Sequence, residues 1–252
     1  METSHVSLLP IAMFCVTRCF SHFRIMKQLI ASLAITWTAL SLSAKAEALR
    51  IMPVGDSITE GGSTFSHYRL PLLLKLRAAG VSFVYAGSRQ SASPQGPLAH
   101  EGYGGKNSRF LVETVPSNFA KHPADVVLLH ACHNHFAEQK PIPGIIEDHV
   151  ALITAFRKIN PKVMVFVAKP ITSAKLPKYS YLTEVGEQLA AMAKRLHTDQ
   201  QPVIIVDQAK GFDPRKDTIA DLVHPNQQGA EKMAQRWFEA LKPWVALTQK
   251  TR

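Results

Sequence analysis

Short apolar segments alternate with helix-like segments along most of the chain, and this alternation constrains the fold more than any other feature. The segment 125–130 contains the apolar run Val126 to Leu129, which is typical of a strand buried on both faces of a parallel sheet. Strands are predicted at 49–54, 81–86, 125–130, 163–168 and 203–206, and helices at 66–79, 107–119, 143 or 144–159, 181–197 and 226–245. We therefore expect an α/β fold, a three-layer α/β/α sandwich with a five-stranded parallel sheet in a flavodoxin-like arrangement.

Residues of types that catalyse reactions or bind ligands stand directly after the predicted strands. In an open parallel sheet, ligands bind beyond the carboxyl ends of the strands. Ser57, the pair Gly104-Gly105, Asn134 and His224 all fall on that edge. The Ser-, Pro- and Gly-rich segment 89–106 is predicted to be the longest loop, and long ordered loops in compact domains are usually functional. We expect the functional site at this edge of the sheet.

The first 46 residues have the features of an export signal. Met26-Lys27-Gln28 is a short basic start, Leu29 to Ala44 is mostly apolar, and Ala44-Lys45-Ala46 is a small-x-small cleavage site. The apolar run is short for a membrane span. We therefore expect cleavage after Ala46, a single domain over 47–252 without stable membrane insertion, and a periplasmic or secreted location. An uncleaved anchor is the alternative, and translation could start at Met1 or Met26.

Cysteine content and charge narrow the class of protein. Cys132 is the only cysteine after Ala46, so the mature domain cannot form an internal disulfide and must rely on its core. The chain has 29 basic and 19 acidic residues, and few of either kind precede residue 47, so the domain is basic. Its basic residues are scattered, which favours a solvated surface over a nucleic-acid groove and leaves attraction to an acidic polysaccharide open.

Two motifs near opposite ends of the domain combine into a hydrolytic set. Ser57 follows the strand 49–54 within Gly55-Asp56-Ser57, and Asp221 precedes His224 by three residues. A serine hydroxyl needs a base to become a nucleophile, and a carboxylate can orient the imidazole that serves as this base. Alone, Asp56-Ser57 would be interpreted as a turn or a helix N-cap. Together the motifs predict Ser57 as nucleophile, His224 as base and Asp221 as its orienting acid.

With these motifs the chain resembles the SGNH hydrolases of the GDSL esterase superfamily, over essentially the whole mature domain. Within it, the chain is most similar to carbohydrate O-acetylesterases of the acetyl xylan esterase type, on segments 50–59, 68–69, 84–88 and 100–105. The resemblance implies an oxyanion hole formed by the N–H groups of Ser57 and Gly105 and the side-chain amide of Asn134. The neighbouring Gly104 leaves the assignment of Gly105 open by one residue, and a plain turn is the alternative for both glycines.

The third motif departs from the pattern of the family, in which the strand is usually followed by Gly-x-Asn-Asp. This chain has Cys132-His133-Asn134-His135, so Asn134 is kept, Cys132 replaces a glycine, and His135 replaces an acid that supports the loop. We expect these changes to affect the geometry of the oxyanion hole more than the identity of its donors. They also suggest a subgroup whose substrate is not xylan.

The histidines around this motif raise the question of a metal site, since imidazole is a common zinc ligand. Alternate side chains along a strand point to opposite faces, so His133 and His135 are expected to share a side and His130 to differ from both. No carboxylate–histidine set in the sequence completes a site. We therefore predict no metal and no cofactor, and expect these histidines to support the site or contact substrate.

The sequence as a whole predicts an exported serine esterase that removes O-acetyl groups from carbohydrates through an acyl-enzyme. Its expected partner is an acetylated oligo- or polysaccharide, not a nucleic acid, and the sequence does not indicate an oligomeric state. One alternative is a lysophospholipase or thioesterase on the same scaffold, and another is a non-catalytic carbohydrate-binding relative. Arg69 is expected either to orient the active-site loop or to lie on a helix face. Glu101 is expected either to position the Gly105 turn or to meet sugar hydroxyls.

Overall fold

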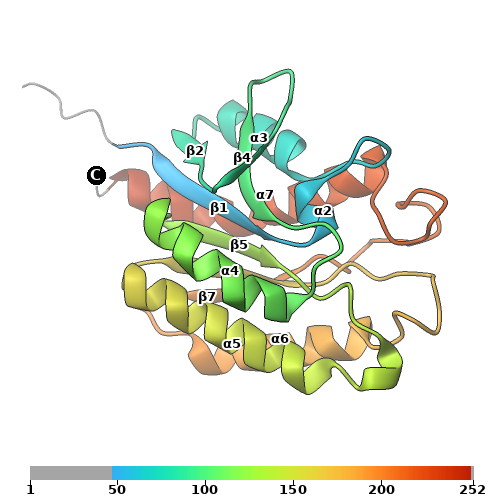
Figure 1. The fold of residues 1–252 in the computed structure, drawn as a ribbon. Helices are drawn as coiled ribbons and strands as arrows, with labels where there is room; N and C mark the ends of the chain where they lie inside the picture. Colours follow the sequence, from blue (N-terminus) through green and yellow to red (C-terminus); the bar gives the residue numbers. More distant parts are fainter. Residues whose placement is uncertain (1–46, 251–252) are drawn as a thin grey trace, which may run out of the picture. The chain divides into compact units, whose positions relative to one another are not determined.

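A mixed, mostly parallel sheet organises residues 47–250, which are the residues that the computed structural model describes (Figure 1). Its order is β3-β4-β1-β5-β6-β7, and β2 also pairs with β1. The predicted α/β class is confirmed, but the sheet has seven strands instead of five, and β3 and β4 are antiparallel. The predicted leader, 1–46, lies outside the described residues. The strands are β1 (Leu49–Gly55), β2 (Phe83–Tyr85), β3 (Arg89–Ser91), β4 (Leu98–Gly102), β5 (Val126–His130), β6 (Met164–Lys169) and β7 (Val203–Asp207).

The segment 89–106, predicted to be a loop, contains the two additional strands. β2 pairs with the first half of β1, where Leu49 lies opposite Phe83. β4 pairs with its last two residues, where Gly55 lies opposite Gly102. The sequence concealed these strands because they are short and because β3 is polar throughout, so neither shows an apolar period. The pairing of β4 brings the turn after Gly102 to the carboxyl end of β1.

Helices cover both faces of the sheet and give the expected three layers. The two faces carry separate hydrophobic clusters, one beneath α4, α5 and α6 and the other beneath α3 and α7. Successive residues of β5 alternate between the clusters, so Val127 packs into the first and Val126 into the second. None of the helices in 47–250 is long and apolar enough to cross a membrane. The helices are α2 (Ser57–Glu60), α3 (Arg69–Ala78), α4 (Ser108–Lys121), η1 (Ala137–Gln139), α5 (Ile142–Ile159), α6 (Leu182–Leu196) and α7 (Gln227–Lys250).

Candidate active site

The chain turns sharply at the end of β1, and Ser57 is the first residue of α2 after that turn. Asp56 caps the helix, because its Oδ1 accepts a hydrogen bond from the N–H of Ile58 at 3.0 Å and its Oδ2 one from the N–H of His133 at 3.3 Å. Burial raises the pKa of the Asp56 carboxyl to about 6, although these bonds oppose the shift. Gly55 is needed at the turn, since a Cβ there would lie 2.2 Å from a backbone carbonyl oxygen of β5.

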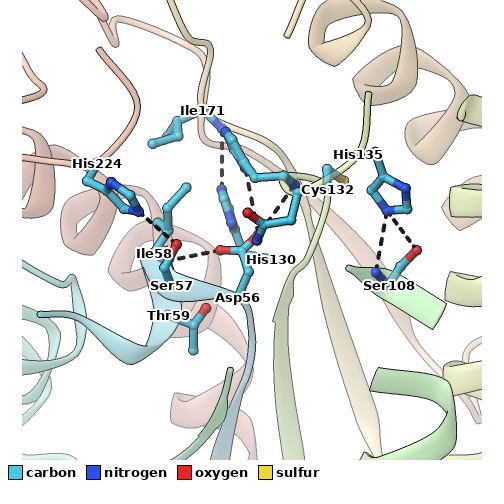
Figure 2. Close-up of polar contacts among 12 residues, drawn as sticks. Asp56, Ser57, Ile58, Thr59, Ser108, His130, Cys132, His135, Ile171 and His224 are labelled. Carbon is cyan, nitrogen blue, oxygen red and sulfur yellow. Dashed lines mark hydrogen bonds and ion pairs between the residues drawn. The ribbon is translucent and has the colours of Figure 1, made fainter. Parts of the chain in front are cut away.

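Ser57, His224 and Asp221 form a chain of side-chain hydrogen bonds. Ser57 Oγ lies 2.8 Å from His224 Nε2 (Figure 2), and His224 Nδ1 lies 2.5 Å from Asp221 Oδ2. Asp221 Oδ1 accepts the backbone N–H groups of Val223 and His224, at 2.9 and 3.0 Å. Burial acts to raise the pKa of Asp221, but the hydrogen bonds from the His224 ring and from both backbone N–H groups hold it below its ordinary value. An ionised Asp221 therefore orients the ring with Nε2 toward Ser57.

A loop between α2 and α3 supports His224 from the side. The ring of Phe65 stacks on the imidazole, with centroids 4.1 Å apart and an interplanar angle of 26°. The N–H of Ser66 donates to the carbonyl of Pro225 at 3.0 Å, which ties this loop to the residue after His224. The sequence carries no signal for this role of Phe65, and its pattern predicts the next helix from Ser66, three residues before α3 begins at Arg69.

Of the three donors expected in an oxyanion hole, Gly105 lies in a turn that borders Ser57, and Asn134 bonds to the residue that follows this turn. A Cβ on Gly104 would lie 3.8 Å from that of Ser57, so the turn after β4 lies next to the serine. Gly105 has a φ of 72°, and neither its N–H nor that of Ser57 is hydrogen-bonded within 47–250. The Gly104 N–H is already donated to a glutamate carboxylate. The Asn134 amide donates one N–H to the carbonyl of Lys106 at 3.0 Å, which leaves a second N–H for another acceptor.

Glu60 holds the Gly104-Gly105 turn from the end of α2. Its Oε2 accepts the N–H of Gly104 at 2.5 Å, and its Oε1 forms an ion pair with Arg89. A Cβ on Gly104 would lie 2.5 Å from Oε2, so the missing side chain permits this approach. Sequence analysis gave Glu60 no role, because the fold alone brings it to a turn 44 positions away in the chain.

Arg69, whose role the sequence left open, lies buried beneath the site. Its guanidinium donates to the carbonyl oxygens of Thr59, Glu60 and Leu98, at 2.7, 2.6 and 3.0 Å, and to the hydroxyl of Ser91 at 2.9 Å. Burial lowers the pKa of Arg69 to about 10, so the side chain remains charged at neutral pH. Arg69 therefore fixes the end of α2 against β3 and β4, and is not a residue of an exposed helix face.

Glu101, the other residue of open role, is fully buried in β4. Its carboxylate accepts hydrogen bonds from the N–H of Ser88, from the hydroxyl of Tyr103 at 2.6 Å and from the amide of Asn118 at 3.0 Å. A buried carboxylate with these partners is closed to sugar hydroxyls. Glu101 instead fixes Tyr103, the residue directly before the Gly104-Gly105 turn.

The two altered residues of the third motif, Cys132 and His135, lie in different surroundings. Cys132 packs into the hydrophobic cluster under α4–α6, and burial raises the pKa of its thiol. Its carbonyl accepts the hydroxyl of Tyr181 at 2.9 Å. His135 turns away from Ser57 to the start of α4, where Nε2 lies 3.1 Å from Ser108 Oγ (Figure 2). The hydroxyl of Ser108 in turn donates to Asp148 at 2.7 Å, so His135 anchors the loop to α4 and α5.

The expected grouping of the three histidines is wrong. His130 and His133 lie together, with ring centroids 5.7 Å apart, whereas His135 lies at the start of α4. Strand alternation cannot be extended to residue 133, because β5 ends at His130. Asp56 joins His130 and His133 in a buried group whose potential ligand atoms lie within 4.8 Å of one another. The fold therefore supplies a carboxylate–histidine set that the sequence did not reveal.

Two members of this buried group, His130 and Asp56, already use part of their hydrogen-bonding capacity. His130 Nε2 accepts the N–H of Ile171 at 3.3 Å, which places the proton of the neutral ring on Nδ1. Burial lowers the pKa of His130 to about 4, so the ring is neutral at pH 7. His130 would thus offer a cation either an N–H or a nitrogen already in use, and Asp56 already accepts two backbone N–H groups, whereas neither ring nitrogen of His133 has a hydrogen-bond partner within 47–250.

Comparisons with known proteins agree with this architecture. The structure is similar to a carbohydrate esterase family 3 protein from Talaromyces cellulolyticus, with a TM-score of 0.70 and 22% identity over 79% of this chain and 98% of that chain. It is also similar to a family 3 carbohydrate esterase from Clostridium thermocellum, with a TM-score of 0.70 and 24% identity over 80% and 98% of the two chains. No curated protein sequence matches the chain. The model of the GDSL-like lipase/acylhydrolase family matches residues 54–232, which confirms the superfamily resemblance. The chain belongs to the GDSL-like lipase/acylhydrolase family.

Proposed function

We propose that this protein is an exported serine esterase that removes O-acetyl groups from carbohydrates through an acyl-enzyme intermediate. The observation that carries the proposal is the hydrogen-bond chain from Ser57 Oγ through the His224 ring to Asp221. Such a chain activates a hydroxyl for attack on a carbonyl carbon and needs no cofactor. Two similar structures are named as carbohydrate esterases of family 3, which supports an acetylated carbohydrate as the substrate.

In the first half of the reaction, Ser57 Oγ bonds to the ester carbonyl carbon while its proton passes to His224 Nε2. Asp221 stabilises the imidazolium that forms. The carbonyl oxygen becomes an oxyanion that accepts hydrogen bonds from the N–H groups of Ser57 and Gly105 and from the Asn134 amide. The bond to the sugar oxygen then breaks, and His224 returns its proton to that oxygen, which leaves acetyl-Ser57 and a free sugar hydroxyl.

In the second half, water takes the place of the sugar. His224 removes a proton from the water, the resulting oxygen attacks the acetyl carbon, and acetate departs as the proton returns to Ser57. Neither half requires an oxidant, a reductant or a metal ion. The proposed division of roles places all chemistry on the carboxyl edge of the sheet, on residues that follow β1, β4, β5 and β7.

Acetate release tests the proposed function. The purified protein should release acetate from at least one of a panel of O-acetylated glycans and from 4-nitrophenyl acetate, and Ser57→Ala should abolish both activities. Circular dichroism of the variant should match the wild type, because Ser57 is only partly buried and the change removes a single hydroxyl. Glycan binding without release of acetate by the wild type would instead support a non-catalytic relative.

Hydrolysis of esters with longer acyl chains is the second candidate function, and a groove beside the site favours it. Phe65, whose ring stacks on His224, lines a hollow of about 400 Å³. The wall of this hollow also includes the apolar residues Leu70, Pro71, Leu74 and Ala230 and the polar residues Ser66, His67, Gln227 and Glu231. This groove could receive the alkyl chain of a lysophospholipid or thioester. A series of 4-nitrophenyl esters from acetate to palmitate separates the candidates. Highest kcat/KM for acetate supports the deacetylase, and a maximum at eight carbons or more supports the lipase.

Glu60 should affect turnover through the Gly104-Gly105 turn. Glu60→Ala removes the carboxylate that accepts the Gly104 N–H, and hydrogen bonds to charged groups contribute about 1.5–3 kcal/mol. We expect kcat for 4-nitrophenyl acetate to fall about tenfold or more with little change in KM, because the turn contributes to the transition state. Glu60→Gln keeps an acceptor oxygen and should recover most of this loss. The exposed Glu113→Ala is the matched control, and equal loss in Glu60→Gln and Glu60→Ala would contradict a role in holding the turn.

A further inference from the structure

Two lysines flank the segment that carries Asn134, and neither is neutralised by an acidic side chain. Lys106 follows Gly105 directly, and its carbonyl accepts the Asn134 amide at 3.0 Å. Lys178, from the loop after β6, places its ammonium 4.9 Å from the ring centroid of Phe136, two residues beyond Asn134. Within 47–250, neither lysine belongs to an ion pair. Both positive charges therefore remain available at the rim of the site.

Aromatic rings hold both ammonium groups in place. Lys106 Nζ lies 5.0 Å from the ring centroid of Phe110, and Lys178 Nζ lies 5.1 Å from that of Tyr179 as well as close to Phe136. A cation over a ring face is attracted by the ring quadrupole, yet it keeps its N–H donors for another partner. The lysine side chains are thus partly ordered before any anion arrives, which lowers the entropy cost of binding one.

Two exposed or half-exposed arginines near the site, Arg89 and Arg109, are paired with acids, which distinguishes them from the lysines. Arg89 pairs with Glu60, and Arg109 lies 2.7 Å from Asp148. Their charges are locally balanced by acids of the scaffold. The unpaired positive charge at the rim therefore comes from lysines. The loop after β5 adds the exposed Lys140 and the loop after β6 adds the exposed Lys175, against one exposed acid in these two loops, Glu138.

Phe136 adds an apolar surface to this rim. Its side chain is 48% exposed. An apolar ring beside unpaired ammonium groups matches a sugar that carries both an apolar face and a carboxylate. A neutral glycan would use the ring but leave the two charges without a partner.

We infer that Lys106 and Lys178 bind carboxylate groups of the substrate, so that the glycan deacetylated by this protein is an acidic, uronate-containing polysaccharide. The inference rests on the proposed esterase function, whose substrate it narrows. Attraction between exposed charges is weakened by salt, and it changes encounter and KM more than the chemical step. The preference for an acidic glycan should therefore be strongest at low ionic strength.

The test compares kcat/KM for acetate release from O-acetylated polygalacturonate with that from O-acetylated glucomannan, a neutral glycan, at 10 and 300 mM NaCl. We expect the acidic glycan to be preferred at least tenfold at low salt and the preference to shrink at high salt. Lys106→Gln and Lys178→Gln should each lower the acidic-to-neutral ratio about threefold, and the double variant about tenfold. Each variant is judged by the ratio of its kcat/KM values for the two glycans. A loss of activity that affects both glycans equally therefore leaves this ratio unchanged.

Lys162→Gln is the matched control, since Lys162 is exposed in the turn before β6, at the opposite edge of the sheet. It removes the same charge and should leave the ratio unchanged. Equal kcat/KM for the two glycans in the wild type, or an unchanged ratio in the double variant, would overturn the inference while acetate release upheld the esterase. Absence of acetate release from both glycans and from 4-nitrophenyl acetate would overturn the proposed function together with the inference.

Discussion

Replacement of His224 by alanine is expected to lower kcat for 4-nitrophenyl acetate by about 10⁴- to 10⁶-fold, the range typical for loss of the base in a serine hydrolase. Ser57 Oγ would lose the nitrogen that lies 2.8 Å away, and no other described histidine contacts this hydroxyl. The residual rate should come from binding and from the oxyanion donors. A stopped-flow or long-incubation assay measures it, with active-site titration to exclude contaminating wild-type enzyme.

The double variant Ser57→Ala/His224→Ala tests whether the two residues act as a unit. Residues that act in one step lose nearly all their contribution when either is removed, so the double variant should be no slower than the slower single variant. His122→Ala, at the half-exposed end of α4, controls for the loss of a histidine and should keep wild-type kcat. Losses that multiply in the double variant would show that Ser57 and His224 act independently, against the proposed mechanism.

The parts of this site that local sequence determines could be predicted. Asp221 and His224 are three residues apart, so a short turn suffices to bring the carboxylate to the ring nitrogen. Ser57 follows a strand with a strong apolar signal, and the position of that strand in the sheet places the serine at the carboxyl edge. The sequence predicts α5 and β5 for the same reason, since their own residues carry the pattern, a helical period in α5 and a continuous apolar run in β5.

The parts that depend on distant segments could not be predicted. Arg69 reaches Leu98, 29 positions away, and Glu60 reaches Gly104, 44 positions away, only because β4 pairs with the end of β1. The sequence does not predict the pairing of β4 with β1, because β4 is short and carries His100 and Glu101 among its buried residues. A buried charge looks like a surface residue in the sequence until its partners are known. The same holds for His133, whose neighbours include Asp56 in the turn after β1 and Tyr179 in the loop after β6.

Buried histidines should make the folded state sensitive to mild acid. Burial lowers the pKa of His67, His130 and His149 to about 4, and that of His100 to about 3, from an ordinary value of 6.5. Between pH 6.5 and 4, the unfolded chain therefore binds protons that the folded protein does not bind. The free energy of unfolding is fully retained above pH 6.5 and falls as the pH drops through this interval.

The size of the loss can be gauged from His130 and His149, two of the completely enclosed histidines. His130 and His149 should each contribute roughly 3 kcal/mol, and His100 adds to them in the same direction. Asp56 opposes them, because its pKa is raised to about 6 and the folded state binds its proton more readily than the unfolded chain between pH 6 and 3.8. The net loss is several kcal/mol, which is comparable to the whole stability of a typical domain.

We therefore expect the urea midpoint of unfolding to fall steeply between pH 6.5 and 4.5 and the protein to unfold without denaturant near pH 4. His149→Leu keeps a similar volume in α5 and removes one titrating group, so it should reduce the loss by roughly 3 kcal/mol while changing stability little at pH 7.5. His122→Gln controls for the removal of a partly exposed histidine. A midpoint that stays constant from pH 7.5 to 4.5 would mean that these rings are not enclosed, because an imidazole that reaches water has no reason to favour its neutral form in the folded state.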